Sequence, residues 1–212
     1  MDPEFWHHRW ENNQIGFHEG ETNALLEAHF GGLGLPGGSR IFLPLCGKTR
    51  DIAWLLDQGY RIAGAELSAT AIGQLFEELG LTPAVTALGP VQRYSAPGID
   101  IFVGDIFDLT AAALRPVDAV YDRAALVALP DAMRMHYARH LMAITETASQ
   151  FLICFAYDQG LMEGPPFSVP GGEVRRLYGE RYEIINAASK QLPGGLKGQH
   201  EATEDVWLLV PK

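Results

Sequence analysis

Residues 40–68 read RIFLPLCGKTRDIAWLLDQGYRIAGAELS, and this stretch decides the fold. Its first apolar run, residues 41–45, carries a proline near its end and has the composition of a buried parallel strand that stops at a sheet edge. Gly47 then allows a tight turn. Apolar residues within 52–56 recur at helical spacing, and Gly59 follows as a helix stop. We therefore expect a strand, a glycine turn and a helix in this order.

A second expected strand, residues 61–65, leads into Glu66, which lies 19 positions beyond Gly47. A strand, turn, helix and strand that end in a carboxylate at this separation are typical of the mononucleotide half of a Rossmann-type sheet. In that unit the acid accepts hydrogen bonds from ribose hydroxyls. Glu66 is therefore the first candidate ligand residue, and the alternative is that it caps the helix expected over residues 69–79.

Two sharper nucleotide motifs are excluded in the same stretch. Residues 47–49, Gly-Lys-Thr, resemble the end of a P-loop, but that motif needs a glycine at the position of Phe42. The G-x-G-x-x-G fingerprint also fails, because Leu43, Leu45 and Lys48 stand where close approach to a pyrophosphate would require glycines. A cofactor with a ribose but no phosphate fits better, and S-adenosylmethionine is such a cofactor.

The whole-chain composition narrows the class of protein and its surroundings. The chain has 212 residues, a mass of 23.2 kDa, a net charge of −10 and a pI near 5.1. We expect one domain, residues 1–212. The acidic charge disfavours nucleic-acid and anionic-membrane partners. Because no run approaches a membrane span and the start MDPEFWHHRW lacks signal-peptide character, we expect a cytoplasmic protein. We also expect a monomer with a small-molecule substrate.

Neither a metal nor a cysteine nucleophile is expected. Cys46 and Cys154 lie in apolar strand contexts that suit buried, reduced thiols, and no base is obvious for a nucleophilic Cys46. No Cys and His cluster has zinc-ligand spacing. His7 and His8 are adjacent, so on a helix they would point in different directions.

The N-terminal segment is unusually aromatic. Asp2 and Pro3 form a helix start, and Phe5, Trp6 and Trp10 follow within one short helix. These rings either pack against the core or cover a ligand, and composition alone favours packing.

The rest of the chain alternates between strands and helices, which predicts a parallel α/β sheet. Helices are expected at residues 22–30, 69–79, 131–144 and 173–178, and strands within 84–103 and at 117–121, 150–157, 182–187 and 205–210. Since no helix separates the last two strands, we expect an antiparallel pair at the end of the sheet. The proline-rich residues 164–170 should form a rigid loop at the same edge as the other loops.

Two further strand ends carry candidate cofactor ligands. Asp105 begins a loop that could hold an adenine, or it caps the short helix that ends at Leu114. Arg123 follows the strand at 117–121, and its guanidinium could pair with a cofactor carboxylate. The alternative is an ordinary surface ion pair that involves Asp122.

Several of these pieces, taken in chain order, resemble the thiopurine S-methyltransferases, a family of S-adenosylmethionine-dependent enzymes. The matching pieces are Trp10, Phe17-His18, FLPLCGK at 42–48, Glu66, IFDL at 106–109, DRAALVA at 122–128 and GPPF at 164–167. The resemblance covers nearly the whole chain. It implies a seven-stranded class I methyltransferase fold, Rossmann-like, with a mostly parallel sheet and an antiparallel C-terminal strand. In such a domain residues 1–38 would form N-terminal cover helices and residues 39–212 the Rossmann-like core.

The resemblance also implies roles for individual residues. Four side chains would contact S-adenosylmethionine: Trp10, Leu45, Glu66 and Arg123. The backbone around Ile106 would hold its adenine, and Phe17 and Arg123 would lie near the acceptor. It assigns no side-chain role to Asp105, and because residues 190–203 match less clearly, substrate contacts there stay open.

The implied activity is in-line transfer of a methyl group to the sulfur of thiopurines and other aromatic or heterocyclic thiols, with release of S-adenosylhomocysteine. No general base is expected, because the donor is already activated and thiols ionise readily. The alternatives are methylation of selenium or tellurium species and a non-enzymatic binding module for S-adenosylmethionine. The absent glycine fingerprint argues against a nicotinamide-dependent reductase.

Overall fold

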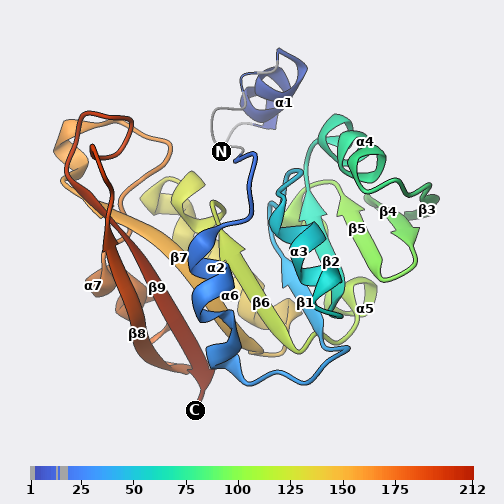
Figure 1. Cartoon of the computed structure of the whole chain (residues 1–212). Helices are drawn as coiled ribbons and strands as arrows, with labels where there is room; N and C mark the ends of the chain where they lie inside the picture. Colours follow the sequence, from blue (N-terminus) through green and yellow to red (C-terminus); the bar gives the residue numbers. More distant parts are fainter. Residues whose placement is uncertain (1–2, 13, 15–18) are drawn as a thin grey trace.

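The computed structural model describes residues 3–12, 14 and 19–212 and has a central sheet with helices on both faces (Figure 1). In the described residues the sheet has nine strands in the order β3-β4-β5-β2-β1-β6-β7-β9-β8. The strands are β1 Arg40–Leu43, β2 Arg61–Glu66, β3 Ala84–Leu88, β4 Val91–Ala96, β5 Ile99–Val103, β6 Ala119–Arg123, β7 Ser149–Tyr157, β8 Tyr182–Gln191 and β9 Ala202–Pro211.

The helices alternate with the strands, as the sequence pattern predicts. The α-helices are α1 Pro3–Glu11, α2 Ala24–His29, α3 Asp51–Asp57, α4 Ala69–Glu78, α5 Ala111–Leu114, α6 Asp131–Ile144 and α7 Gly171–Tyr178. Short 3-10 helices are η1 Phe30–Leu33, η2 Ile106–Asp108, η3 Leu126–Ala128 and η4 Gln159–Leu161. Figure 1 shows α1 above the carboxyl ends of the parallel strands.

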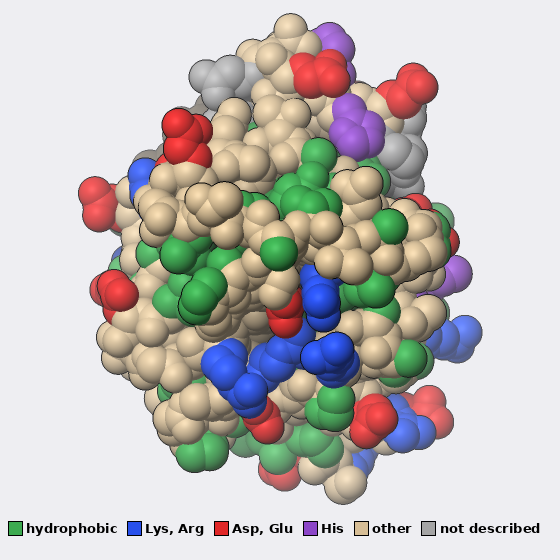
Figure 2. Space-filling view, turned by 90° about the vertical axis from the view of Figure 1, so that its right-hand side faces the viewer, with side chains coloured by type: hydrophobic (Ala, Val, Ile, Leu, Met, Phe, Trp, Pro, Cys, Tyr) green, Lys and Arg blue, Asp and Glu red, His purple; other side chains and the backbone are tan. Residues whose placement is uncertain are grey.

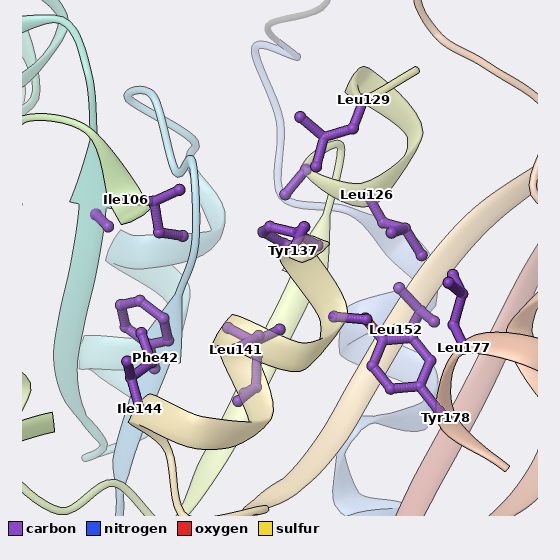
Figure 3. Packing of buried hydrophobic residues seen from close by; sticks show 14 of the residues in the cluster. Phe42, Ile106, Leu126, Leu129, Tyr137, Leu141, Ile144, Leu152, Leu177 and Tyr178 are labelled. Atoms are coloured by element: carbon purple, nitrogen blue, oxygen red, sulfur yellow. The ribbon is translucent and has the colours of Figure 1, made fainter. Parts of the chain in front are cut away.

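The central strands are buried on both faces, which explains their nearly continuous apolar composition. In β1, Ile41 and Leu43 point into the core beneath α2, α3 and α4, whereas Phe42 points into the opposite core. Figure 3 shows this second core, where Phe42 lies near Leu141 and Ile144 of α6. Because side chains alternate along a strand, each central strand contributes to two hydrophobic cores.

The described sheet has two strands more than the seven expected, and these two strands form one hairpin. Seven of the strands, β5-β2-β1-β6-β7-β9-β8, contain the expected parallel sheet, and β4 and β3 extend it beyond β5. The hairpin turns at Gly89, whose φ is 64°, and pairs Leu88 with Val91. Short strands were expected within residues 84–103, but the local pattern does not say that they join the main sheet.

The expected antiparallel ending is confirmed. β9 lies antiparallel between β7 and β8, and both closing strands are longer than the sequence pattern indicates. The pairing of β8 with β9 contains a register shift between Asn186 and Ala188. A bulge of this kind bends the strand and increases its twist.

Charge is distributed unevenly over the surface despite the acidic total. Figure 2 shows basic side chains gathered on one part of the face that lies at the right of Figure 1, with acidic side chains beside them. Across the described part of the chain, none of the helices combines the length and the apolar character needed to cross a membrane.

Candidate active site

A cavity of about 590 Å³ lies at the carboxyl edge of the parallel strands, beneath α1. Its wall takes residues from the ends of five neighbouring strands and from the cover helix. They include Trp6, Arg9 and Trp10 of α1, Leu45, Cys46 and Gly47 after β1, Glu66 of β2, Asp105 and Ile106 after β5, Arg123 of β6 and Phe155 of β7. Binding sites of doubly wound sheets lie at this edge.

Glu66 occupies the wall of this cavity as a buried carboxylate. One carboxylate oxygen, Oε2, accepts the amide of Gly47 at 2.8 Å, and Oε1 accepts the amide of Ser68 at 2.9 Å. The helix cap is instead supplied by Ser68, whose hydroxyl accepts the amide of Ala71. A carboxylate has about four acceptor positions, so these hydrogen bonds leave it able to accept from further donors. Burial raises the pKa of Glu66, although these hydrogen bonds oppose the shift.

The turn after β1 brings the cover helix onto the sheet edge. Leu45 and Gly47 both have left-handed backbone conformations, with φ values of 47° and 51°. A Cβ atom at Gly47 would lie 3.0 Å from the ring of Trp10, and Trp10 is buried. The indole therefore packs on the bare backbone of the turn, which a larger residue at position 47 would prevent.

The loop after β5 contains two of the predicted site residues, Asp105 and Ile106. Asp105 is exposed, and its Oδ1 caps η2 by accepting the amide of Phe107 at 2.9 Å. The expectation that Asp105 caps the short helix ending at Leu114 is wrong, because Thr110 caps that helix. Ile106 is buried, and His140 of α6 holds its carbonyl at 2.7 Å. Burial lowers the pKa of His140, which favours the neutral imidazole.

Arg123 is held as a charged group in the wall at the end of β6. Its side chain is 10% exposed and forms an ion pair with Glu19. Burial by itself would lower the pKa of Arg123, but Tyr121 and the carboxylates of Glu19, Asp51 and Glu204 outweigh burial and raise it. The guanidinium is therefore not part of an ordinary surface ion pair.

Asp122 points away from Arg123 into the opposite core. It accepts the hydroxyl of Tyr137 at 2.7 Å and the amide of Leu126 at 3.1 Å. Burial raises the pKa of Asp122 to about 6. This carboxylate fixes the beginning of the loop that follows β6.

Two residues of this region carry no clear signal in the sequence. Asp51 lines the cavity and accepts the hydroxyl of Tyr121 and the amide of Asn23, each at 2.8 Å. In sequence it is only an acid at the start of a helix. Arg134 is buried in α6, where it joins the carbonyl of Leu129 to that of Ser168. An arginine in an amphipathic helix usually lies on the face that is exposed to solvent.

Three further predictions concern Cys46, a metal site and Phe17. Burial, together with the nearby Glu66, raises the pKa of Cys46 well above its ordinary value, so its thiol is protonated and unsuited to act as a nucleophile. Within the described ranges, no three His, Cys, Asp or Glu side chains form a group that could hold a metal ion. Phe17 lies outside the described residues.

Comparisons with known proteins agree with this architecture. The family model for thiopurine S-methyltransferase matches residues 1–208. A thiopurine S-methyltransferase of Xanthobacter autotrophicus is 61% identical over 210 residues, which cover 99% of each chain. One of Teredinibacter turnerae is 48% identical over 99% of this chain and 97% of its own.

Solved structures that are less similar in sequence share the fold. An S-adenosylmethionine-dependent methyltransferase of Anabaena variabilis matches with a TM-score of 0.67 at 14% identity, over 99% of this chain and 95% of its own. A didemethyltoxoflavin N1-methyltransferase of Burkholderia thailandensis, solved with S-adenosylhomocysteine, gives a TM-score of 0.64 at 13% identity, over 98% and 87% of the two chains. Because the family model matches residues 1–208, nearly the whole of this chain, the chain belongs to the thiopurine S-methyltransferase family.

Proposed function

We propose that this protein transfers the methyl group of S-adenosylmethionine to the sulfur of thiopurines and other aromatic or heterocyclic thiols. Its membership of the family supports the reaction. The observation that carries the proposal is the buried carboxylate of Glu66, which ends β2 inside the cavity and is able to accept further hydrogen bonds from ribose hydroxyls.

The order of the strands suggests how the ligands lie along the cavity. We assign the adenine to the backbone at Ile106 after β5 and the ribose to Glu66 of β2. The methionine part then lies over Leu45 after β1 and reaches Arg123 of β6, because β5, β2, β1 and β6 are neighbours in this order. Trp10 covers this part of the cavity from α1. We therefore assign the acceptor to the remaining side of the cavity, near Phe155 of β7.

Catalysis by these residues would consist mainly of positioning and exclusion of water. S-adenosylmethionine supplies a methyl group that is already activated by a sulfonium. The protein's task is to align the acceptor sulfur with that group, and good alignment can contribute as much as ~7–11 kcal/mol. The ring of Trp10, which packs over the turn at Gly47, would shield this part of the cavity from water. Arg123 holds an anionic group by charge, either the cofactor carboxylate or the acceptor.

Replacing Arg123 with alanine is expected to lower kcat/KM by roughly 10- to 100-fold, because a charge-assisted contact contributes about 1.5–3 kcal/mol. Arg123→Lys keeps the charge but not the planar guanidinium, so its kcat/KM should lie between those of the wild type and Arg123→Ala. Arg61→Ala serves as the control, since Arg61 contacts a backbone carbonyl at the opposite end of the sheet. Steady-state kinetics with an aromatic thiol measure the effect, and an Arg123→Ala enzyme with unchanged kcat/KM would remove Arg123 from the mechanism.

The acceptor can be tested directly with the purified protein. Labelled S-adenosylmethionine is offered with mercaptopurine, a simple aromatic thiol, selenite and tellurite in parallel reactions. We expect labelled thioethers from mercaptopurine and from the aromatic thiol. Product only from selenite or tellurite would overturn the proposed acceptor, and binding of the cofactor without any transfer would indicate a binding module.

We also propose that residues 1–212 act as one unit, as a monomer in the cytoplasm, with the N-terminal segment 1–38 as a cover over the core 39–212. The support is that Trp6 and Trp10 of α1 line the same cavity as core residues of the same chain. Sedimentation of the purified protein would test the monomer, and a stable dimer would contradict it.

A further inference from the structure

The acceptor side of the cavity is built from two late segments of the chain. Its apolar wall contains Phe155 of β7, Pro165, Pro166 and Leu196. Pro166 is fixed there because its carbonyl accepts the hydroxyl of Tyr157 at 2.7 Å. The strand order puts this wall at the end of the cavity opposite the proposed adenine position. The assignment of this wall to the acceptor rests on the proposed function.

Lys197 is the charged residue that borders this wall. Its ammonium group donates to the carbonyl of Pro165 at 3.3 Å, so it lies across the rim of the cavity from one late segment to the other. The preceding residue anchors it, because Leu196 is buried and its amide donates to the carbonyl of His200 at 2.7 Å. Lys197 itself is exposed and has a φ of 52°.

The other cations of the cavity wall each have a contact of their own, and Arg123 also has the ligand role proposed above. Lys48 forms an ion pair with Glu78 at 2.7 Å. Arg123 pairs with Glu19. The guanidinium of Arg9 stacks over the ring of Phe5 at 4.7 Å. In the described part of the chain, neither Arg9 nor Lys197 has a carboxylate within ion-pair distance, and of these two Lys197 is the one that contacts the acceptor wall.

We infer that Lys197 binds the negative charge of the acceptor and that the acceptor enters the site as an aromatic thiolate. An apolar wall with one uncompensated ammonium at its rim matches a flat aromatic anion. The protein carries a net charge of −10, which would otherwise repel such an anion. Lys197 thus selects ionised thiols over neutral compounds of the same shape.

The charge balance of methyl transfer agrees with this assignment. The thiolate sulfur forms a bond to the methyl carbon, while the bond from that carbon to the sulfonium breaks and its electron pair stays on the departing sulfur. An anion and a cation become two neutral thioethers, and no proton moves in this step. The thiol proton has already passed to solvent, so the site needs a cation at the acceptor and no base.

The test compares an anion with its neutral methylated form. The probes are para-nitrothiophenol, which its electron-poor ring keeps ionised at neutral pH, and the corresponding methyl thioether. Titration calorimetry measures the Kd of each probe for the protein saturated with S-adenosylhomocysteine, so the readout does not depend on turnover. The variants are Lys197→Met and Lys197→Arg.

Lys212→Met is a matched control, because Lys212 is also an exposed lysine that donates to a backbone carbonyl, that of Gly179 at 2.6 Å. We expect Lys197→Met to raise the Kd of the thiolate about 3- to 10-fold, the size of one exposed charge contact. The Kd of the thioether should not change. Lys197→Arg should restore thiolate binding, and Lys212→Met should resemble the wild type.

Two outcomes would overturn the inference. An unchanged Kd of the thiolate in Lys197→Met means that Lys197 does not bind its charge. Equal losses for thiolate and thioether mean that Lys197 only shapes the wall. A wild-type protein that binds both probes but transfers no methyl group in a separate assay would instead contradict the proposed function.

Discussion

Replacing Glu66 with alanine should weaken binding of S-adenosylmethionine by roughly two to four orders of magnitude. Two hydrogen bonds from ribose hydroxyls to a carboxylate contribute about 1.5–3 kcal/mol each, and 1.4 kcal/mol corresponds to a factor of ten. The substitution also leaves the amides of Gly47 and Ser68 without their acceptor, which loosens the turn under the cofactor. Calorimetric titration with S-adenosylhomocysteine measures the loss.

The pH dependence of binding distinguishes the charge of Glu66 from its shape. Burial raises the pKa of Glu66, and the carboxylate is the form that accepts two hydroxyls. Affinity should therefore be greatest above this raised pKa and should fall as the pH falls through it. Glu66→Gln should bind S-adenosylhomocysteine weakly, and its affinity should not fall further at low pH. Glu77→Ala, on the exposed face of α4, should resemble the wild type. Wild-type affinity that does not change on acidification would contradict the role of Glu66.

Replacing Arg134 with methionine should both destabilise the protein and raise KM for the acceptor. The guanidinium donates to the carbonyl of Leu129 at 2.8 Å and to that of Ser168 at 3.2 Å, and it pairs with Glu173 at 2.7 Å. Breaking a buried ion pair on one side costs about 3–5 kcal/mol. The same contacts hold the loop after β6 against the loop that carries Pro166, so their loss should displace the acceptor wall.

A second buried arginine separates these two effects. Arg40 also donates to a backbone carbonyl, that of Leu114, and pairs with Asp100 at 3.4 Å, but it lies at the opposite end of the sheet. Arg40→Met should lower stability and leave the KM of the acceptor unchanged. Denaturant unfolding and steady-state kinetics measure both properties. If Arg134→Met raised KM no more than Arg40→Met does, its role would be structural alone.

The half of the site made by consecutive elements could be predicted from the sequence. The strand, turn, helix and strand of residues 40–66 follow from local periodicity, and the separation between Gly47 and Glu66 places the carboxylate beside the turn. The hydrogen bond from the amide of Gly47 to Glu66 confirms that juxtaposition. Ile106 and Arg123 could likewise be placed at strand ends, because parallel strands end at the same edge.

The other half depends on contacts between distant segments, which local patterns do not contain. The ion pair of Arg123 with Glu19 joins positions from opposite halves of the chain. The approach of Lys197 to Pro165 joins two irregular loops. The extension of the sheet by β3 and β4 is also a tertiary outcome, since a hairpin signal gives no information about which sheet accepts it. The roles of the cofactor-binding side chains stay predictions, as does that of Phe17.

The most direct test of sulfur methylation at this site is to locate the transferred methyl group. S-adenosylmethionine with an NMR-active carbon isotope in its methyl group is incubated with mercaptopurine and the purified protein, and a heteronuclear correlation spectrum identifies the atom that carries the label. We expect an S-methyl group, correlated with the ring carbon that bears the sulfur, at a rate that falls strongly in Glu66→Ala. A label on a ring nitrogen, or one that never leaves the donor, would contradict the assignment of this site as a sulfur methyltransferase.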